Sequence, residues 1–324
     1  MINIKKPLTL IFALISLFAC QQEEMSLENN EELKGASEIT QITDDLDSKI
    51  KISAEEELAF MNSLSDFDSE AFALALEKEP QRISNNRSIG EVWGIGSGRT
   101  VWKWNGTSWG QPNPAARLDI VEVAKNGENS VWGIGRGGSV WKWNGASWGQ
   151  PNPAARLTRI AVHSSSIAFG IAQNRTLFVT ANGGQNWAPF TNFQNASWIS
   201  SGNYSNLLSV SDTSGNLYRY ELFPGVMEPV TIPQNTAVIS HATMFGGGVW
   251  ASEGNYGNLY RSTDYVNFIE PNTNLTGVRV ISTNAYSKAW AIRGGRTVWK
   301  TNNSGASWYQ PNSAARLDYI SAAW

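Results

Sequence analysis

One sequence pattern occurs six times in this chain, at intervals of about 39 residues, from Ile89 to the last residue. The two clearest copies are VWGIGSGRTVWKWNGTSWGQPNPAARLDIVEV, which starts at Val92, and VWGIGRGGSVWKWNGASWGQPNPAARLTRIAV, which starts at Val131. Looser copies start at Ala168, Leu207, Val249 and Ala289. A repeat this short has no core of its own, so the fold must consist of copies packed against one another.

Two columns of the repeat are apolar in every copy. The first column contains Trp93, Trp132, Phe169, Leu208, Trp250 and Trp290, and the second contains Trp102, Trp141, Phe178, Tyr218, Tyr260 and Trp299. In each copy the second column follows a Val or Leu directly. Adjacent residues of a strand point to opposite faces, so both faces must be covered, as in small sheets packed front to back.

The strand content of one repeat predicts the architecture. Each copy has about three short runs rich in Val, Ile, Trp and Tyr, bounded by Gly, Asn and Ser clusters, and a weaker fourth run near a Trp. That weaker run lies near Trp109, Trp148, Trp187 and Trp308. Four strands in about 40 residues are typical of a propeller blade, so we predict an all-β, six-bladed β-propeller. The final LDYISAAW repeats the LDIVEV run that opens other blades, which predicts that the C-terminal strand closes the first blade.

The motifs VWGIG, TVWKWNGTSW and AARLDIVEV resemble the tectonin (tachylectin-type) repeat, and the resemblance covers residues 89–324. It implies a six-bladed propeller lectin that recognises carbohydrate, often on microbial surfaces, through several equivalent shallow sites. The segments TANGGQNW at Thr180 and TNNSGASW at Thr301 also resemble the Asp-box turn of sialidase-type propellers. That motif is a structural turn outside the active site, so it indicates a propeller and not a sialidase.

The N-terminus differs from the repeats. Lys5 and Lys6 precede an apolar run over residues 8–19, which ends at Cys20, the single cysteine. The run is shorter than the roughly 20 residues that a membrane-spanning helix needs. It resembles a bacterial lipoprotein signal, which predicts a signal peptide over residues 1–19 and lipidation of Cys20; an ordinary cleaved secretory signal is the alternative. The following segment, Gln21-Gln22-Glu23-Glu24, is similar to the acidic export signal of surface lipoproteins in the Bacteroidetes group, which predicts a lipid-anchored, surface-exposed protein of the outer membrane.

Two further units are expected before the ring. Residues 20–51 predict an acidic disordered tether, and residues 52–82 a short helical segment. Ser53 and Glu56 fit a capping box, and Asp66 is a candidate cap for a second helix. Residues 21–88 carry 6 basic and 17 acidic side chains, whereas residues 89–324 carry 17 basic and 11 acidic ones. This asymmetry indicates separate units, and we expect the helical segment to act as a spacer that docks weakly.

Few residues suggest catalysis. His163 and His241 are not at metal-ligand spacing, and neither a phosphate-binding loop nor a nucleophile elbow is present, so no enzyme activity, metal or cofactor is expected. The Asp residues of the ring are typical turn formers, although two carboxylates from different blades could still form a glycosidase-like pair.

Sugar-binding candidates come from a column that varies between copies. Trp104 and Trp143 occupy a column that holds Thr, Tyr or Ser elsewhere, so they are candidates for stacking on a sugar. Nearby residues that could supply hydrogen bonds are Arg99, Arg136, Asn105 and Asn144. The alternative for the two asparagines is a structural role, because Asn-Gly is a strong hairpin-turn signal.

A second candidate site is the unit QPNPAARLD at Gln111, which is repeated as QPNPAARLT at Gln150 and returns as QPNSAARLD at Gln310. It predicts a rigid loop between blades and brings the following candidates to equivalent places: Arg117, Arg156 and Arg316, with Asn113, Asn152 and Asn312. The alternative is that each arginine holds its loop to the neighbouring blade by hydrogen bonds to backbone carbonyls.

Two functions therefore compete. The first is a surface-anchored lectin whose partners are glycans or glycoconjugates, bound through multiple weak sites. The alternative is a protein-interaction scaffold of the cell envelope, and a polysaccharide-processing enzyme is third. Membrane contact is expected through the N-terminal lipid only, and nucleic-acid binding is not expected because the basic excess of the ring is modest.

Overall fold

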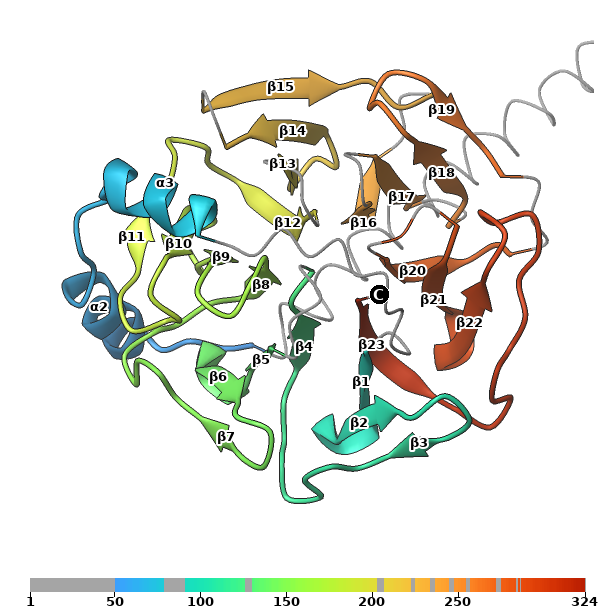
Figure 1. Ribbon diagram of the computed structural model, residues 1–324, viewed down its shortest axis with the longest axis horizontal. Coiled ribbons are helices and arrows are strands. Elements are labelled where there is room, and N and C mark those ends of the chain that lie inside the picture. The colour runs from blue at the N-terminus through green and yellow to red at the C-terminus, as the bar shows by residue number, and fades with distance from the viewer. Residues whose placement is uncertain are drawn as a thin grey trace, which may run out of the picture.

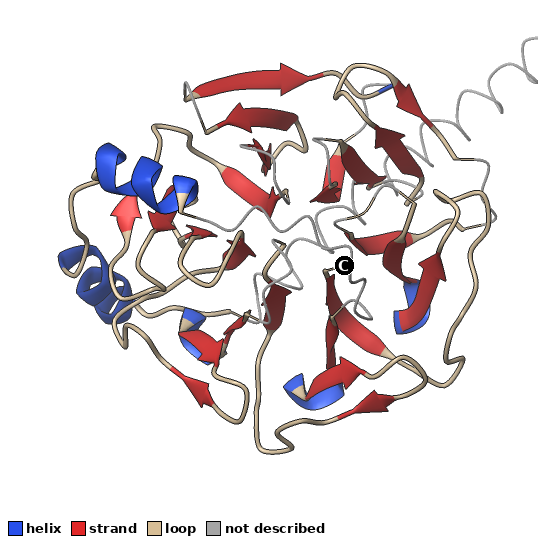
Figure 2. Ribbon diagram, in the orientation of Figure 1, coloured by secondary structure: helices blue, strands red, loops and turns tan. Residues whose placement is uncertain are grey.

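The computed structural model describes residues 50–78, 91–125, 130–202, 207–222, 225–233, 237–244, 248–254, 257–271, 275–283, 285 and 287–323. The predicted signal peptide, Cys20 and the tether up to residue 49 lie outside the described residues. Six small antiparallel sheets are arranged around a central axis (Figure 1), and strands dominate the ring while two short helices lie at one side (Figure 2). The predicted all-β, six-bladed β-propeller is confirmed.

The blades follow one another along the chain. Blade 1 contains β23 (Leu317–Ala322), β1 (Val92–Gly96), β2 (Val101–Trp104) and β3 (Trp109–Gly110). Blade 2 contains β4 (Ile120–Val123), β5 (Val131–Ile134), β6 (Val140–Trp143) and β7 (Trp148–Gly149). Blade 3 contains β8 (Arg159–Val162), β9 (Ala168–Ile171), β10 (Leu177–Thr180) and β11 (Ala188–Pro189).

Blades 4 to 6 complete the ring. Blade 4 contains β12 (Ala196–Ser201), β13 (Leu207–Asp212), β14 (Leu217–Glu221) and β15 (Val226–Val230). Blade 5 contains β16 (Val238–Thr243), β17 (Val249–Glu253), β18 (Leu259–Ser262) and β19 (Phe268–Ile269). Blade 6 contains β20 (Val278–Ser282), β21 (Ala289–Arg293) and β22 (Thr297–Thr301), and its fourth strand is reduced to a bridge between Lys300 and Tyr309.

The two ends of the ring meet in blade 1. Strand β23 pairs antiparallel with β1, with Val92 opposite Ala322 and Gly94 opposite Ile320. The backbone N–H of Ala323 also donates to the carbonyl of Glu91 at 2.9 Å. The predicted closure by the C-terminal strand is therefore confirmed, and it pairs a sheet edge that would otherwise be exposed.

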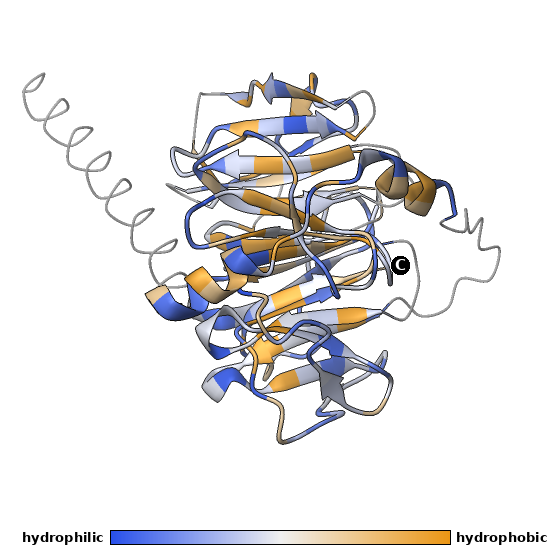
Figure 3. Cartoon of the chain, turned by 90° about the vertical axis from the view of Figure 1, so that its left-hand side faces the viewer, coloured by the Kyte–Doolittle hydropathy of each residue, from blue (hydrophilic) through white to orange (hydrophobic). Residues whose placement is uncertain are grey.

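Tryptophans of the first column lie between consecutive blades. Trp93 of blade 1 packs edge-on against Trp143 and Trp148 of blade 2, at ring-centroid distances of 5.8 and 6.1 Å. The same edge-on contact joins Trp290 to Trp104, Trp132 to Trp187, and Trp250 to Trp308. All four first-column indoles are 0 % exposed. Figure 3 shows the apolar residues running along the strands of the ring, where these contacts form.

Serine side chains of the inner strands add hydrogen bonds between blades. Ser321 of blade 1 accepts from the backbone N–H of Val123 in blade 2 at 3.0 Å. The pattern returns between blades 4 and 5 at Ser200, between blades 5 and 6 at Ser240, and between blades 6 and 1 at Ser282. The inner strands are thus joined by directed bonds as well as by packing.

One buried polar group makes the stability of the ring sensitive to pH. His241 in β16 is 1 % exposed, and its Nδ1 lies 2.9 Å from the Oγ of Ser209. Burial lowers the pKa of His241 from its ordinary value of 6.5 to about 3. The imidazole therefore stays neutral in the folded chain at pH values where the unfolded chain binds a proton.

We expect the free energy of unfolding to decrease as pH falls from about 6.5 towards 3, because the unfolded state binds the additional proton in this window. The contribution of His241 to the slope approaches roughly 1.4 kcal/mol per pH unit. Urea unfolding at several pH values should give a shallower slope for His241→Asn, whose amide can still bond to Ser209. Parallel slopes for the two proteins would contradict the prediction.

The described N-terminal segment, residues 50–78, contains two helices. Helix α2 (Ala54–Asn62) begins with the predicted capping box: Ser53 accepts from the N–H of Glu56, and Glu56 accepts from the N–H of Ser53. Helix α3 (Ser69–Glu77) is capped by Asp68 and not by Asp66, because the Asp68 carboxylate is the one that accepts from the N–H of Ala71. The prediction of Asp66 as the cap was wrong by two residues.

This segment packs firmly on the ring, which differs from the expected spacer with weak docking. Phe60 of α2 is 1 % exposed and lies 5.3 Å, centroid to centroid, from Phe178 of blade 3. Phe72 of α3 is 3 % exposed and packs edge-on against Phe169 at 6.2 Å. The backbone N–H of Ser65 donates to the carbonyl of Trp187 at 2.9 Å. The strength of this docking could not be predicted from the sequence, because the partner side chains belong to distant repeats.

We expect Phe60→Ala to lower the free energy of unfolding by about 3 kcal/mol, since it leaves a cavity between α2 and blade 3. Leu58→Ala is the matched control in the same helix, because Leu58 is 62 % exposed. Chemical denaturation followed by tryptophan fluorescence measures both. Equal stability of the two variants would show that α2 does not pack on the ring.

Candidate binding site

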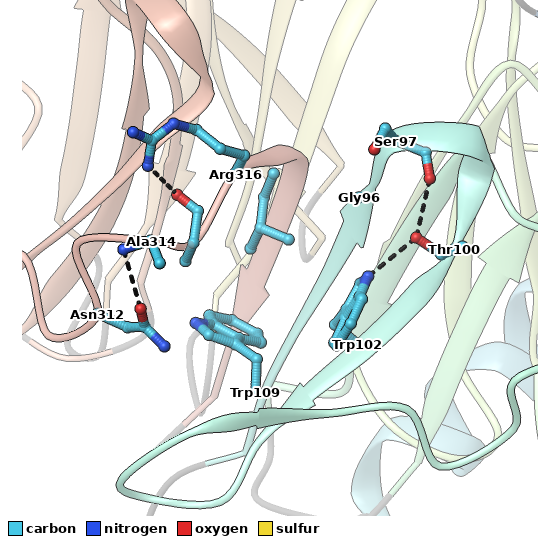
Figure 4. Close-up of a pocket in the computed structure, with 10 residues that line it drawn as sticks. Gly96, Ser97, Thr100, Trp102, Trp109, Asn312, Ala314 and Arg316 are labelled. Carbon is cyan, nitrogen blue, oxygen red and sulfur yellow. Dashed lines mark hydrogen bonds between the residues drawn. The ribbon is translucent and has the colours of Figure 1, made fainter.

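A pocket of about 330 Å³ lies where the loop that leaves blade 6 crosses blade 1 (Figure 4). One wall comes from blade 1 and includes Trp102 and Trp109; the other comes from the loop and includes Asn312 and Arg316. The remaining lining residues are Gly96, Ser97, Thr100, Ala314, Ala315 and Leu317. Trp102 and Trp109 are both half-buried, so aromatic surface is accessible in the pocket.

Hydrogen bonds fix the blade wall. The indole N–H of Trp102 donates to the Oγ1 of Thr100 at 2.9 Å, and this hydroxyl donates to the carbonyl of Ser97 at 3.0 Å (Figure 4). The indole orientation is therefore set before any ligand arrives, which reduces the entropy cost of binding.

The loop wall is fixed in a similar way. The Oδ1 of Asn312 accepts from the N–H of Ala314 at 3.0 Å. The guanidinium Nη1 of Arg316 donates hydrogen bonds to the carbonyls of Ser313 and Ala315, at 2.7 and 2.8 Å. Both side chains hold the loop in shape, and the rest of the guanidinium remains at the exposed rim.

The same arrangement occurs at three places, which we call seams. Seam 1 is the pocket above, formed by loop residues 310–317 and blade 1; seam 2 is formed by residues 111–118 and blade 2, and seam 3 by residues 150–157 and blade 3. Trp102 corresponds to Trp141 in seam 2 and to Phe178 in seam 3. The indole of Trp141 donates to Ser139 at 3.0 Å, so seam 2 repeats the hydrogen bond of seam 1.

The loop candidates of the sequence meet at these seams in equivalent positions. Asn113 and Asn152 accept from backbone N–H groups two residues on, as Asn312 does. Arg117 and Arg156 donate to two carbonyls of their own loops, as Arg316 does. These arginines do bond to backbone carbonyls, but the carbonyls belong to the same loop and not to the neighbouring blade, which differs from the alternative expected for them.

Trp104 and Trp143 are placed differently from the expectation. Trp104 is 6 % exposed and lies 5.4 Å from Trp109 and 5.8 Å from Trp290 of blade 6. Trp143 is half-buried against Trp93. These indoles fill the interface between blades, so the structure offers no open face of Trp104 for a sugar. They vary between copies because other side chains can fill the same space.

Arg99 and Arg136 are not equivalent residues. Arg99 has a φ of 65°, and its guanidinium binds both carboxylate oxygens of Asp119, at 2.6 and 2.9 Å. The position equivalent to Arg99 is Arg296 in blade 6, which pairs with Asp318, and Gly138 in blade 2. Arg136 instead replaces Ser97 and is exposed at seam 2.

Asn105 and Asn144 form turns. The Oδ1 of Asn105 accepts from the N–H groups of Thr107 and Ser108, and that of Asn144 accepts from Ala146 and Ser147. Both side chains are exposed and bonded within their own hairpins. These hydrogen bonds agree with the alternative that the two asparagines have a structural role in hairpin turns.

Sequence reasoning missed Trp102 and Trp109 as pocket residues. Their columns are aromatic in nearly every copy, which was interpreted as packing. In the structure these side chains both pack and line a pocket, because they lie at the edge of the interface between blades. Half-burial of this kind leaves no sequence signal beyond the aromatic column itself.

Other site chemistries have little support in the described part of the chain. These residues contain no cluster of three or more His, Cys, Asp or Glu able to hold a metal ion. Asp119 and Asp318 are paired with arginines, whereas Asp212 and Asp264 accept hydrogen bonds within their own turns. Within the same residues, no helix has the length and apolar composition needed to cross a bilayer.

The ring is a six-bladed β-propeller in which one loop arrangement occurs at three seams, and a pocket lies at seam 1. Residues 80–221 match the Tectonin domain family, and this match and the six-bladed ring support a tectonin-type β-propeller. No curated protein matches the chain.

Several solved structures are similar to this chain at low identity. YCF48 bound to a D1 peptide is 16 % identical, with a TM-score of 0.48 over 69 % of this chain and 79 % of that one. Virginiamycin B lyase from Staphylococcus aureus is 15 % identical, with a TM-score of 0.45 over 67 % and 83 %. A GH74 enzyme from Niastella koreensis is 14 % identical, with a TM-score of 0.48 over 68 % of this chain and 43 % of that one.

We expect Trp104→Ala to lower the free energy of unfolding by about 3 to 5 kcal/mol, because it empties the space between blades 1 and 6. Tyr309→Ala should have a small effect, since Tyr309 is 44 % exposed. Thermal unfolding of both variants measures the difference. A Trp104 variant as stable as the parent chain would assign the indole to a role other than packing.

Proposed function

We propose that this chain is a lectin that binds carbohydrate at its seams. The observation that carries the proposal is the pocket of seam 1, where two half-buried indoles face a loop with an amide and a guanidinium. Indole faces suit the apolar face of a sugar ring, and amide and guanidinium groups suit its hydroxyls. The match to the Tectonin domain family supports the same function.

Repetition of the seam supports multivalent binding. Seams 1 and 2 have the same loop, the same tryptophans and the same internal hydrogen bonds. A shallow pocket binds one sugar weakly, but two pockets on one rigid ring raise the avidity for a repeating or clustered glycan. The proposal needs neither a metal nor a catalytic group, so we assign no enzyme activity to the chain.

The proposed location is the bacterial cell surface. The lipoprotein-like signal before Cys20 supports a lipid anchor in the outer membrane, with the ring carried outside the cell. Glycans of the envelope, of neighbouring cells or of the surroundings would then be accessible to the seams.

A protein-interaction scaffold is the second candidate, and one observation favours it. Seam 3 is covered by α2 of the same chain, which shows that a polypeptide can occupy a seam. A partner subunit of the envelope could occupy the other seams in this way.

The test is a glycan array probed with the full chain and with a variant that combines Trp102→Ala and Trp141→Ala. We expect loss of each accessible indole to weaken binding about tenfold, because an aromatic contact contributes about 1.5 kcal/mol. Tyr309→Ala is the control, an exposed aromatic residue outside the seam 1 pocket. Near-ultraviolet circular dichroism must show that the variants remain folded. Absence of any glycan binding by the parent chain would favour the scaffold.

A further inference from the structure

Seam 3 already contains a ligand-like group supplied by the chain itself. Glu56 of α2 forms an ion pair with Arg156 of the loop, with a distance of 3.4 Å between Oε1 and Nε. One helical turn later, Phe60 packs on Phe178, the residue that corresponds to Trp102. Ala155 is buried in this seam, whereas its equivalents Ala116 and Ala315 are only half-buried. The seam therefore accommodates one carboxylate and one apolar ring side by side.

The covering of seam 3 depends on Gly138. This residue has a φ of 71°, and a Cβ there would lie 2.6 Å from the Cδ1 of Ile52, which precedes α2. At the equivalent position blade 1 has Arg99 and blade 6 has Arg296, each paired with an aspartate. The aspartate is also replaced at this seam, by Thr158, which directly precedes β8 of blade 3. The N-terminal segment can cross only the seam that lacks this ion pair.

Seams 1 and 2 keep the arginine, and the described part of the chain supplies no acidic partner for Arg117 or Arg316. Arg117 and Arg316 are exposed, and among the described residues their recorded bonds go only to carbonyls of their own loops. Seam 2 has a second exposed cation, Arg136, in the place that Ser97 has in seam 1. Arg316 in seam 1 and Arg117 in seam 2 are thus accessible, whereas the equivalent Arg156 in seam 3 is paired with Glu56.

These observations also indicate the size of a ligand that seams 1 and 2 can accommodate. A second helix on the path of residues 52–60 would collide with the Arg99–Asp119 or Arg296–Asp318 pair, because Ile52 needs the space above a glycine. A compact ligand does not need that path. A sugar with a carboxylate combines the two groups that seam 3 holds: an anion for the arginine and an apolar ring face for the aromatic residue.

We infer that seams 1 and 2 select glycans that carry carboxylates, such as uronic-acid oligosaccharides. The carboxylate pairs with Arg316 in seam 1 and with Arg117 and Arg136 in seam 2, and the sugar ring lies against Trp102 or Trp141. The inference rests on the proposed lectin function and names its ligand class. Seam 3 takes no glycan while α2 covers it.

The test compares oligosaccharides of galacturonate, glucuronate and mannuronate with their methyl esters, which keep the sugar ring and remove the charge. Titration calorimetry with the full chain should give roughly 10- to 100-fold tighter binding for at least one free acid than for its ester, since a hydrogen bond to a charged group is strong. The preference should shrink as salt is raised from low to physiological concentration, because these arginines are exposed.

Variants connect the preference to the seams. Arg136→Gln leaves every recorded loop hydrogen bond intact and should weaken binding of the free acid several-fold, with no change for the ester. Arg117→Gln combined with Arg316→Gln should abolish the preference. Arg156→Gln is the matched control, because the same loop is altered in the covered seam, and it should leave glycan binding unchanged.

The outcomes separate this inference from the proposed function. Binding of neutral glycans or esters as tightly as the free acids would overturn the inference and leave the lectin function standing. Binding of no glycan, charged or neutral, would overturn both. Displacement of a bound uronate by a synthetic peptide of residues 50–66, together with equal affinity for acid and ester, would overturn the inference in favour of a helical protein ligand.

Discussion

The contact on which the ring depends is the edge-on packing of one indole against the next blade. Trp93, Trp132, Trp250 and Trp290 each extend from the second strand of a blade and meet a tryptophan of the following one. A cation of the same blade lies over the face of each of these indoles, for example Lys142 at 4.9 Å from the ring of Trp132. Each indole buries a large apolar area and has a preferred geometry for its partners, so it fixes both the distance and the angle between blades.

The seams are a by-product of this packing. Where two blades diverge beyond the buried indoles, the outer aromatic residues Trp102 and Trp109 remain half-buried, and the connecting loop passes over them. The loop is rigid because its own Asn and Arg side chains satisfy its backbone groups. A pocket with walls set in this way requires little reorganisation on binding.

The N-terminal segment breaks the symmetry of the ring. The seams are related by sequence repetition, but α2 covers one of them because Gly138 and Thr158 replace the Arg–Asp pair found in blades 1 and 6. The acidic character of the segment suits the basic ring, and Glu56 meets Arg156 directly. Near-identical repeats therefore differ in whether their seams are accessible to a ligand. The number of similar repeats does not equal the number of accessible seams.

The sequence by itself determined the number of blades, the closure through the last strand and the rigid QPNPAARLD loops, because these follow from periodicity and from local turn chemistry. It also indicated the capping box at Ser53, which involves residues three apart. The tertiary structure alone decided that Trp104 is core while Trp102 lines a pocket, since both are aromatic residues of one strand and only the neighbouring blade distinguishes them. It alone decided where residues 50–78 lie, because Phe60 and Phe178 are more than a hundred residues apart and no local pattern specifies such a contact.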